Sequence, residues 1–398
     1  MERRLSSPMA PTYLVSAPGK VIVFGEHAAV FGQPAIAAAI SLRSYLLVTT
    51  LSKTQHTIRL NFRDIGLDHT WDIDTLPWSV FQQPSKKTFY NSLVTSLDPE
   101  LSDAVMPYAE AVSKNLPEKQ RRIHVRSATA FLYLYLSLSS RENPGVTYTL
   151  RSTIPIGAGL GSSASVCVCL STALLLQIRT VSGPHEEQSQ AEADQQIERI
   201  NQWAFVGELC IHGEPSGVDN TVSAGGHAVL FRRTSFESKV TRINEFPKLR
   251  LLLVDTRQTR STAAQVEKVR RLKTDFCTLT GSILDGIGQA TNSALDIISS
   301  ADFDGGGRRE ALERLGTLIR INHGLLVSLG VSHPRLGRIC ELVDHADVGW
   351  TKLTGAGGGG YAITLFRPDI TNETVQELGR KFAAEGFQKC SVGLQLAW

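Results

Sequence analysis

Residues Pro155–Ser165 read Pro-Ile-Gly-Ala-Gly-Leu-Gly-Ser-Ser-Ala-Ser, between a predicted strand at Val146–Thr153 and a predicted apolar helix at Ser162–Thr180. Glycines at alternate positions let the backbone approach a ligand closely and turn successive N–H groups toward it. The first turn of the helix adds free N–H groups and the positive end of its dipole, which favour an anion. No Gly-Lys-Ser/Thr sequence ends the loop, so it is not a Walker A motif. We interpret it as a phosphate cradle, in preference to a tight turn with an ordinary serine cap.

A second glycine run lies at Gly355–Gly360 and formally matches the G-x-G-x-x-G pattern of dinucleotide-binding loops. That pattern binds a dinucleotide where a helix follows directly. Here the next residues are Tyr361–Phe366, which are rich in strand formers and lack helical periodicity. A nicotinamide oxidoreductase is therefore disfavoured. Five glycines in six residues exceed what a flexible hairpin needs, so we expect close approach of this backbone to a ligand or to the first glycine loop.

Two acids close in sequence are candidates for one site. Helical spacing over a predicted helix at Glu192–Ile211 places Glu208 on an apolar stripe. A buried carboxylate needs a partner, and the residues alone leave a metal ion and a salt bridge equally open. Asp219 follows in a Pro/Gly-containing turn, where a lone aspartate is most often a turn residue. Its position shortly after Glu208 nevertheless makes two acids available to one site.

The N-terminal segment contributes a lysine. Pro18-Gly19-Lys20 is predicted as a turn between strands at Tyr13–Ala17 and Val21–Phe24. Lys20 is a candidate for phosphate binding or charge relay, and the alternative is a solvated lysine at a sheet edge. His27 has no His or Cys at ligand spacing, so a zinc site is not expected there.

Composition sets the limits of these interpretations. The 398 residues are 42% hydrophobic and 20% charged, with a net charge of +3. This suits a folded protein of two or three domains, at about 150 residues per domain, and gives no support to nucleic-acid or membrane-surface binding. Six scattered cysteines indicate a reduced compartment. With no signal-peptide core in the first residues and an apolar run at Ala128–Leu138 too short to span a bilayer, we expect a cytoplasmic location.

The remaining periodicities predict an α/β chain with a boundary near residue 230, dividing it into 1–230 and 231–398. Further strands are predicted at Ala35–Ile40, Ser44–Thr50, Ala228–Arg232, Leu251–Asp255 and Trp350–Thr354. Further helices are predicted at Ala104–Lys114, Lys119–Ser139, Thr262–Ser299, Arg308–Leu329, Pro334–His345 and Glu373–Glu385, with Ser261 as an N-cap.

Taken in order, these segments resemble the GHMP small-molecule kinases. The resemblance rests on a Pro-Gly-Lys segment, the P-x-G-x-G-L-G-S-S-A loop and the late G-A-G-G-G-G run. Within that superfamily the chain is most similar to the branch that acts on mevalonate, over about Tyr13 to Phe387. Four further segments carry that similarity: Gly25–His27, Phe131–Leu136, Ile211–Asn220 and Lys352–Gly357. The resemblance implies two α/β lobes, the first like the second domain of ribosomal protein S5 and the second ferredoxin-like.

The resemblance also implies roles for individual residues. Lys20 and Asp219 would be catalytic, with Asp219 as the proposed base, and Ser163 and Glu208 would hold Mg²⁺. Mevalonate contacts would be Glu26, His27, Asp219, Arg260 and Thr262. ATP contacts would be Lys20, Ser152, Gly157, Ala158, Gly159, Leu160, Gly161, Ser162, Ser163, Gly355 and Gly357. Asp64 stands where the family often has Asn, and the family commonly has one more strand after the point where this chain stops.

The expected function is ATP-dependent phosphorylation of the C5 hydroxyl of mevalonate, which gives 5-phosphomevalonate for isoprenoid and sterol biosynthesis. The resemblance further implies a homodimer and inhibition by prenyl diphosphates at the ATP site. One alternative is a kinase of the same fold acting on phosphomevalonate, homoserine or a sugar. Another is a non-catalytic ligand sensor, which is disfavoured because Lys20, Glu208 and Asp219 are all present. Whether Asp219 takes the proton or only anchors Lys20 stays open.

Overall fold

The computed structural model describes residues 11–52, 54–86, 94–233, 238–243, 246–259, 261–300, 303 and 307–393. The chain forms two compact units, each built from segments that are not consecutive in the sequence. The first unit comprises Met1–Pro18, Arg43–Pro155 and Gly161–Gly225, and the second comprises Gly19–Leu42, Ile156–Leu160 and Gly226–Trp398. The chain passes from the first unit to the second for the last time between Gly225 and Gly226, close to the boundary predicted near residue 230. A domain limit at that boundary stays a prediction.

The first sheet has the strand order β4-β3-β5-β2-β6-β7, and β1 pairs with β2. Its strands are β1 (Tyr13–Phe24), β2 (Pro34–Thr50), β3 (Thr57–Phe62), β4 (Leu67–Asp72), β5 (Val146–Ser152), β6 (Ala228–Arg233) and β7 (Ser238–Ile243). Residues 44–50 of β2 pair with β5, whereas residues 34–38 pair with β6. Two strands, β1 and β2, therefore run from one unit into the other.

The predicted turn at Pro18-Gly19-Lys20 is wrong, because β1 continues through it without interruption. Within this sheet β1 pairs with β2, and a strand at a sheet edge tolerates proline because the missing N–H has no partner to lose. The flanking apolar residues draw the segment inside, so that Lys20 is only 6% exposed. The interpretation of Lys20 as a solvated edge residue is wrong for the same reason. The two predicted strands at residues 35–50 are likewise one strand, β2.

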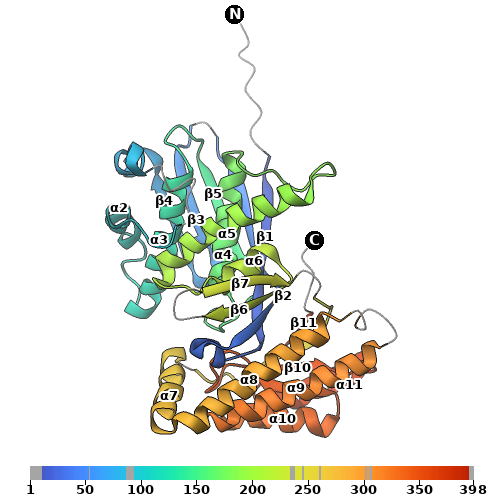
Figure 1. Ribbon diagram of the computed structural model, residues 1–398. Helices are drawn as coiled ribbons and strands as arrows, with labels where there is room; N and C mark the ends of the chain where they lie inside the picture. The colour runs from blue at the N-terminus through green and yellow to red at the C-terminus, as the bar shows by residue number, and fades with distance from the viewer. Residues whose placement is uncertain are drawn as a thin grey trace, which may run out of the picture. The chain divides into compact units, whose positions relative to one another are not determined.

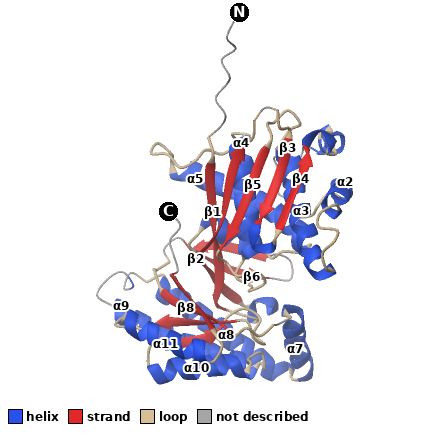
Figure 2. Cartoon of the chain, turned by 180° about the vertical axis from the view of Figure 1, so that it is seen from behind, coloured by secondary structure: helices blue, strands red, loops and turns tan. Residues whose placement is uncertain are grey.

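Helices cover one face of the sheet in the first unit (Figures 1 and 2). They are α1 (Trp78–Phe81), α2 (Pro99–Glu110), α3 (Glu118–Leu138), α4 (Ser162–Gln177), α5 (Gln190–His212) and α6 (Val218–Gly225). The rings of Phe131 on α3 and Tyr148 on β5 meet edge to face with centroids 5.2 Å apart, in the core of this unit. The predicted helix at 104–114 begins earlier, because Asp98 accepts the N–H groups of Glu100 and Leu101 and thereby caps α2.

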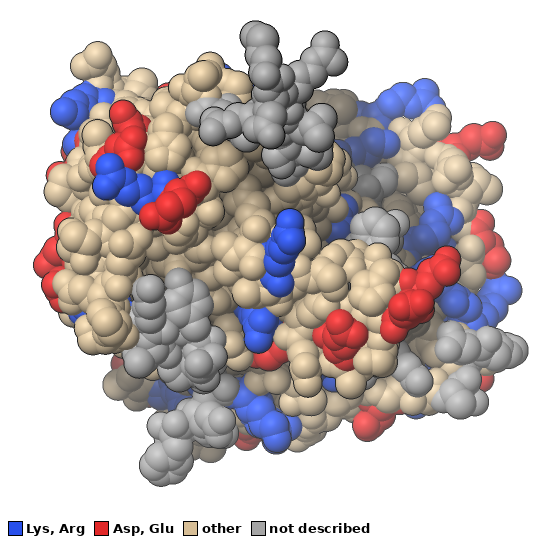
Figure 3. All heavy atoms as spheres, turned by 90° about the horizontal axis from the view of Figure 1, so that it is seen from above, with Lys and Arg blue, Asp and Glu red and all other residues tan. Residues whose placement is uncertain are grey.

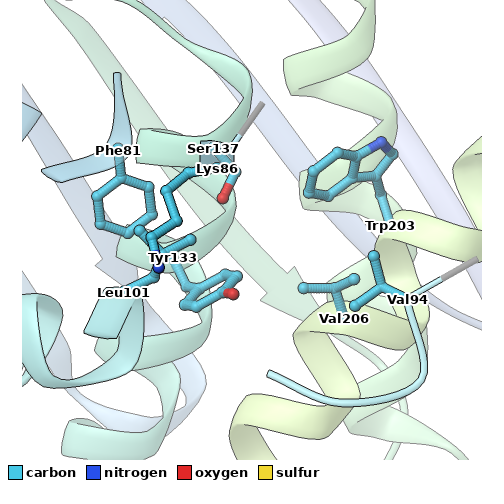
Figure 4. Close-up of a pocket in the computed structure, with 8 residues that line it drawn as sticks. All are labelled: Phe81, Lys86, Val94, Leu101, Tyr133, Ser137, Trp203 and Val206. Atoms are coloured by element: carbon cyan, nitrogen blue, oxygen red, sulfur yellow. The ribbon is translucent and has the colours of Figure 1, made fainter. Parts of the chain in front are cut away.

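A small cavity of about 20 Å³ lies inside the first unit. The side chains of Phe81 and Tyr133 lie on one side of it and those of Trp203 and Val206 on the other (Figure 4). This volume is enough for about one water molecule, and none of the predicted site residues lines the cavity. We therefore treat it as a packing feature.

The second unit contains an antiparallel sheet with the order β11-β8-β10-β9. Its strands are β8 (Arg250–Asp255), β9 (Gly349–Leu353), β10 (Tyr361–Phe366) and β11 (Gln388–Gly393), and its helices are α7 (Thr262–Asp275), α8 (Cys277–Ile298), α9 (Arg308–Ser328), α10 (Pro334–Ala346) and α11 (Asn372–Ala384). Helices α8 to α11 gather on one side of this sheet (Figure 1), where Leu252 and Val254 enter their common core. The mixed α/β, two-part fold confirms the predicted fold class.

Two details differ from expectation at this end of the chain. The single helix predicted at 262–299 is two helices, α7 and α8, with a break at Phe276, where φ is −133° and ψ is 61°. Neither glycine nor proline marks that break, so the sequence carries no signal for it. The second difference is a strand after the last predicted helix: β11 was not predicted, and it pairs with β8 to form one edge of the sheet.

On the face shown in Figure 3, basic and acidic side chains alternate without a field of one sign. Among the described residues, every helix is too short or too polar to cross a bilayer.

Candidate functional site

The glycine loop has the backbone that its sequence predicts. Gly157, Gly159 and Gly161 have φ of 73°, 74° and 74°, a region that other residues adopt at a cost. A Cβ on Gly157 would meet nothing within 4 Å, so backbone conformation rather than crowding requires glycine there. Gly161 is the N-cap of α4, which begins at Ser162. The alternative of an ordinary serine cap is therefore wrong, and the first-turn N–H groups of α4 carry no N-cap side chain over them.

In the first unit, the two residues predicted to hold Mg²⁺ both lie close to His212. Ser163 Oγ is 3.0 Å from His212 Nε2, and Glu208 Oε2 is 3.9 Å from the same nitrogen. Glu208 is only 3% exposed, as its place on an apolar stripe predicts. Cys167 Sγ lies 3.8 Å from Glu208 Oε1 and donates to it. The N-terminus of α4 and the last turn of α5 thus bring a hydroxyl and a carboxylate together.

Burial of this cluster favours a neutral imidazole at His212 and a protonated thiol at Cys167. Burial, and then the nearby Glu208 carboxylate, raise the pKa of the Cys167 thiol well above its usual value. Burial lowers the pKa of His212, although Asp219 acts in the opposite direction. Near neutral pH His212 is therefore a hydrogen-bonding group rather than a cation.

The donor set fits a magnesium ion. A hydroxyl and a carboxylate are the oxygen ligands that Mg²⁺ prefers, and it commonly keeps only one or two protein ligands while phosphates and water fill the rest of its octahedron. Among the described residues there is no group of three or more His, Cys, Asp and Glu side chains that could cage a metal. Ser163 and Glu208 therefore suit a cation that arrives with phosphates better than a structural metal.

Asp219 lies in the first turn of α6 rather than in an open turn. This short helix packs against α4 and α5, and Thr221 Oγ1 donates to the carbonyl of Gly217 at its start. The carboxylate is close enough to His212 to influence its pKa. The first unit thus gathers Ser163, Glu208 and Asp219 from three adjoining helices. The segment around Asp219 was not predicted to be a helix, and His212 was not predicted as a site residue, although it follows Glu208 by one helical turn.

Ser152 lies at the end of β5, where its side chain contacts Ser44 Oγ at 3.0 Å. Its backbone N–H donates to Asp64 Oδ2 at 2.7 Å, and Arg151 Nη1 donates to Oδ1 of the same carboxylate at 3.3 Å. An aspartate suits position 64 in this chain because each of its two carboxylate oxygens accepts one of these bonds, whereas an asparagine has only one such oxygen. The Asp found at position 64, where the family often has Asn, is thus bound by Arg151 and Ser152 of β5.

In the second unit, Glu26 and Lys352 form an ion pair in which neither side chain has measurable exposure. Lys352 Nζ donates to Glu26 Oε1, and Asn322 Nδ2 donates to Oε2 at 3.1 Å. Burial lowers the pKa of Lys352, and the Glu26 carboxylate opposes that shift. Both carboxylate oxygens of Glu26 thus accept from side chains of the protein itself. Lys352 and Asn322 were missed because pairs so far apart in sequence leave no local signal.

His27, next to Glu26, has a positive φ of 60°. Its Nε2 lies 2.8 Å from the carbonyl oxygen of Ala356. A carbonyl accepts only, so Nε2 carries the proton and Nδ1 is an acceptor. Nδ1 is buried and has no hydrogen-bond partner among the described residues. Burial lowers the pKa of His27, so the ring offers a neutral acceptor.

The second glycine run is the connection of the β9–β10 hairpin. Gly355 and the four glycines from 357 to 360 all have positive φ. Gly358 N–H donates to Val331 O at 2.7 Å, and a Cβ on Gly357 would lie 2.0 Å from that oxygen. The backbone does approach another group closely, but within this unit that group is the backbone at Val331, which is neither of the two predicted partners. Because β10 follows directly, the exclusion of a dinucleotide fold is confirmed.

Three further predicted positions belong to the second unit: Lys20, Arg260 and Thr262. Lys20 N–H donates to Leu160 O at 2.9 Å, which ties β1 to the glycine loop. Thr262 is the exposed first residue of α7, and the predicted N-cap Ser261 accepts the N–H of Ala264. Arg260 lies outside the described residues.

Comparison with known proteins agrees with this geometry. The GHMP kinases N terminal domain matches residues 124–226 and the GHMP kinases C terminal domain matches residues 308–385. A mevalonate kinase from Aspergillus fumigatus is 68% identical over 98% of this chain and 72% of its own. One from Gibberella zeae is 60% identical over 98% of this chain and 77% of its own. The crystal structure of L. major mevalonate kinase in complex with R-mevalonate has the same fold, with a TM-score of 0.68, 21% identity and coverage of 100% and 99% of the two chains.

The fold and these matches therefore define a GHMP kinase, a phosphotransferase of a class that uses ATP. Within that class, the chain belongs to the mevalonate kinase family.

Proposed function

We propose that this chain transfers the γ-phosphoryl group of ATP to the C5 hydroxyl of mevalonate in isoprenoid and sterol biosynthesis. One observation carries the site assignment: alternate glycines with positive φ lead into the N-terminus of α4, whose Ser163 shares His212 with the buried Glu208. This is a cradle for phosphates beside an oxygen donor pair. The family to which the chain belongs supplies the acceptor.

In the transfer, the C5 oxygen forms a bond to the γ-phosphorus while the bond from that phosphorus to the bridging oxygen of ADP breaks. The hydroxyl proton leaves to a base, and Asp219 is the proposed acceptor. Phosphoryl transfer needs positioning and charge stabilisation more than covalent chemistry. Backbone N–H groups from Gly157 to Ser162 would hold the phosphate oxygens, and Lys20 would contact the γ-phosphoryl group. Mg²⁺, when bound by Ser163 and Glu208, would neutralise phosphate charge.

The substrate side of the proposal rests on the second unit. His27 Nδ1 is a buried acceptor with no partner among the described residues, which suits a hydroxyl of a small ligand. Glu26, Arg260 and Thr262 are proposed mevalonate contacts from the family, as are Ser152, Gly355 and Gly357 for ATP. For Glu26 the two hydrogen bonds to its carboxylate also support an anchoring role. The proposed homodimer, cytoplasmic location and inhibition by prenyl diphosphates also come from the family.

The decisive experiment is a coupled ADP-release assay on the purified full chain with a panel of alcohols. We expect rapid ADP release with mevalonate and none above background with phosphomevalonate, homoserine or galactose. Faster turnover of any other alcohol would replace the proposed substrate, and absence of turnover with all of them would support the ligand-sensor alternative.

A further inference from the structure

A hollow of about 360 Å³ lies in the second unit, at the start of β8, the first turn of α9 and the end of β10. We call it the α9 hollow, and none of the proposed catalytic, ATP or mevalonate residues lines it. Its volume falls within the range of small-molecule sites, about 300–1,000 Å³. Five basic side chains and one acid line it: Lys248, Arg250, Arg308, Arg309, Arg367 and Asp369.

Strand register places the first of these cations. Leu251 of β8 pairs with Leu365 of β10, so Arg250 stands beside Phe366. The guanidinium carbon lies 5.5 Å from the centre of the Phe366 ring. Arg250 Nη1 donates to Ile370 O at 3.2 Å and Nη2 donates to Asn372 Oδ1 at 3.3 Å. The guanidinium is thus held in place by neutral groups, without a carboxylate among the described residues.

The start of α9 places the second cation. Arg308 is the first residue of this helix, its Nη2 donates to Lys248 O at 2.8 Å, and its guanidinium lies 5.8 Å from the ring of Phe303. Lys248 brings a third cation to the same wall. Within the described part of the chain, neither Arg308 nor Lys248 has an ion-pair partner that would neutralise it.

The other two cations are already compensated. Arg309 pairs with Asp369 at 2.5 Å, and Arg367 pairs with Glu313 and Asp347, each at 3.0 Å. Even after these carboxylates are counted, the charges of Lys248, Arg250 and Arg308 remain. An arginine has five N–H donors, of which these bonds use only one or two. Fixed guanidinium groups with unused donors are suited to phosphate and carboxylate oxygens.

Two further features of the hollow suit an organic anion: a helix N-terminus at its wall and an apolar floor. The first turn of α9, a helix of 21 residues, contributes Arg308 and Arg309 to the lining, so the positive end of its dipole lies at the wall. Leu249, Leu312, Leu365 and Phe366 supply an apolar floor. A ligand with a charged end and a carbon portion could therefore contact both kinds of surface.

We propose that the α9 hollow is a second ligand site, which binds a small organic phosphate carrying two or more negative charges. This proposal does not depend on the phosphoryl-transfer reaction, since the site has its own residues and its own test. Lys248, Arg250 and Arg308 bind the charged group, and the apolar floor receives the remainder of the ligand.

Inorganic pyrophosphate is the probe, titrated calorimetrically into the full chain in buffer with EDTA, so that magnesium pyrophosphate does not form. Three chains are compared: the unaltered chain, the double variant Arg250→Met/Arg308→Met, and the control Arg270→Met/Arg314→Met. The control removes the same charge from two exposed positions of the second unit that do not line the hollow. Any binding at the glycine loop is common to all three chains and cancels in the comparison.

We expect a binding component in the unaltered and control chains that is weakened at least tenfold in the Arg250→Met/Arg308→Met variant. A single Lys248→Met variant breaks no hydrogen bond or ion pair found in the described structure, so it should fold normally. We expect it to weaken the binding component several-fold, which would show that the loss in the double variant is not caused by unfolding. Raising the salt concentration should weaken the same component. Isotherms that are identical for the unaltered chain and the double variant would overturn the proposal.

Discussion

Lys352 and Glu26 form a fully buried ion pair across 326 positions of sequence. The pair, together with Asn322, fixes the segment that also carries His27, whose Nε2 donates to Ala356 a few residues after Lys352. The acid next to the proposed substrate contact His27 therefore has structural partners of its own. Glu26 therefore anchors this segment, whereas His27 Nδ1 remains available to a ligand.

Lys352→Met should strongly destabilise the chain, because it leaves the Glu26 carboxylate buried without its cation. Breaking a buried pair from one side costs about 3–5 kcal/mol. The double variant Glu26→Gln/Lys352→Met should recover part of that loss, since no uncompensated charge remains. Urea unfolding of the single and double variants measures both values. Equal stability of Lys352→Met and the unaltered chain would show that the pair contributes nothing.

His323 predicts how stability depends on pH. Burial and the nearby Lys352 lower its pKa to about 4, below its ordinary value of about 6.5 in an unfolded chain. Protonation is therefore harder in the folded state, so its contribution is present above about pH 6.5 and is lost as pH falls toward 4. At about 1.4 kcal/mol per pKa unit, the loss is up to about 3 kcal/mol.

The His323→Gln variant tests this assignment, since glutamine does not titrate. Unfolding free energies measured between pH 7 and pH 4 should fall less steeply for the variant than for the unaltered chain. The other histidines with a lowered pKa, such as His27 and His212, titrate in the same direction in both chains. Parallel curves would assign the pH dependence to those groups instead.

Asp219→Ala should lower kcat by about 10²–10⁴-fold, the usual contribution of a positioned general base. ATP binding should remain near normal, because the glycine loop and Glu208 are untouched. Asp219→Asn is the matched variant, which keeps the shape of the side chain and removes its charge. Calorimetric ATP binding and steady-state rates separate the two effects, and near-normal turnover of both variants would exclude Asp219 as the base.

Glu208→Gln should raise the Mg²⁺ concentration needed for half-maximal activity by at least tenfold, because a neutral amide replaces a charged oxygen ligand. The substitution should also return the Cys167 thiol closer to its ordinary pKa, since the nearby carboxylate contributes to its raised value. Thiol titration with the metal absent reads out that second effect. The assignment of Glu208 as a ligand fails if the magnesium dependence is unchanged.

Much of the fold followed from local sequence. Alternating glycines before an apolar helix predicted the loop and the start of α4, and the helical stripe predicted that Glu208 is buried. The break at Phe276 and the continuity of β1 through Pro18 were not predictable, because each depends on what the segment packs against. Pro18 and Gly19 are typical turn residues, so the local sequence predicted a turn there. The buried residues on either side of them instead continue β1.

The candidate site was predictable in its residue types and less so in its partners. Nearness in sequence predicted that Glu208 and Asp219 share a site, the resemblance added Ser163, and the first unit brings the three together. Sequence gave no sign that Lys352 and Asn322 hold Glu26, since two buried polar residues find each other only through the tertiary fold. The resemblance assigned Glu26 to contact with mevalonate, and its hydrogen bonds to Lys352 and Asn322 add a role in anchoring the segment.

The distance in sequence between Glu26 and Lys352 also has a consequence for biosynthesis. The chain is made from its N-terminus, so Glu26 leaves the ribosome long before its partner has been synthesised. Until then the loop lacks its cation and the residues from Gly19 to Leu42 lack most of the unit to which they belong. The second unit therefore cannot be completed until Lys352 has been synthesised, and until then Glu26 has no cation to pair with.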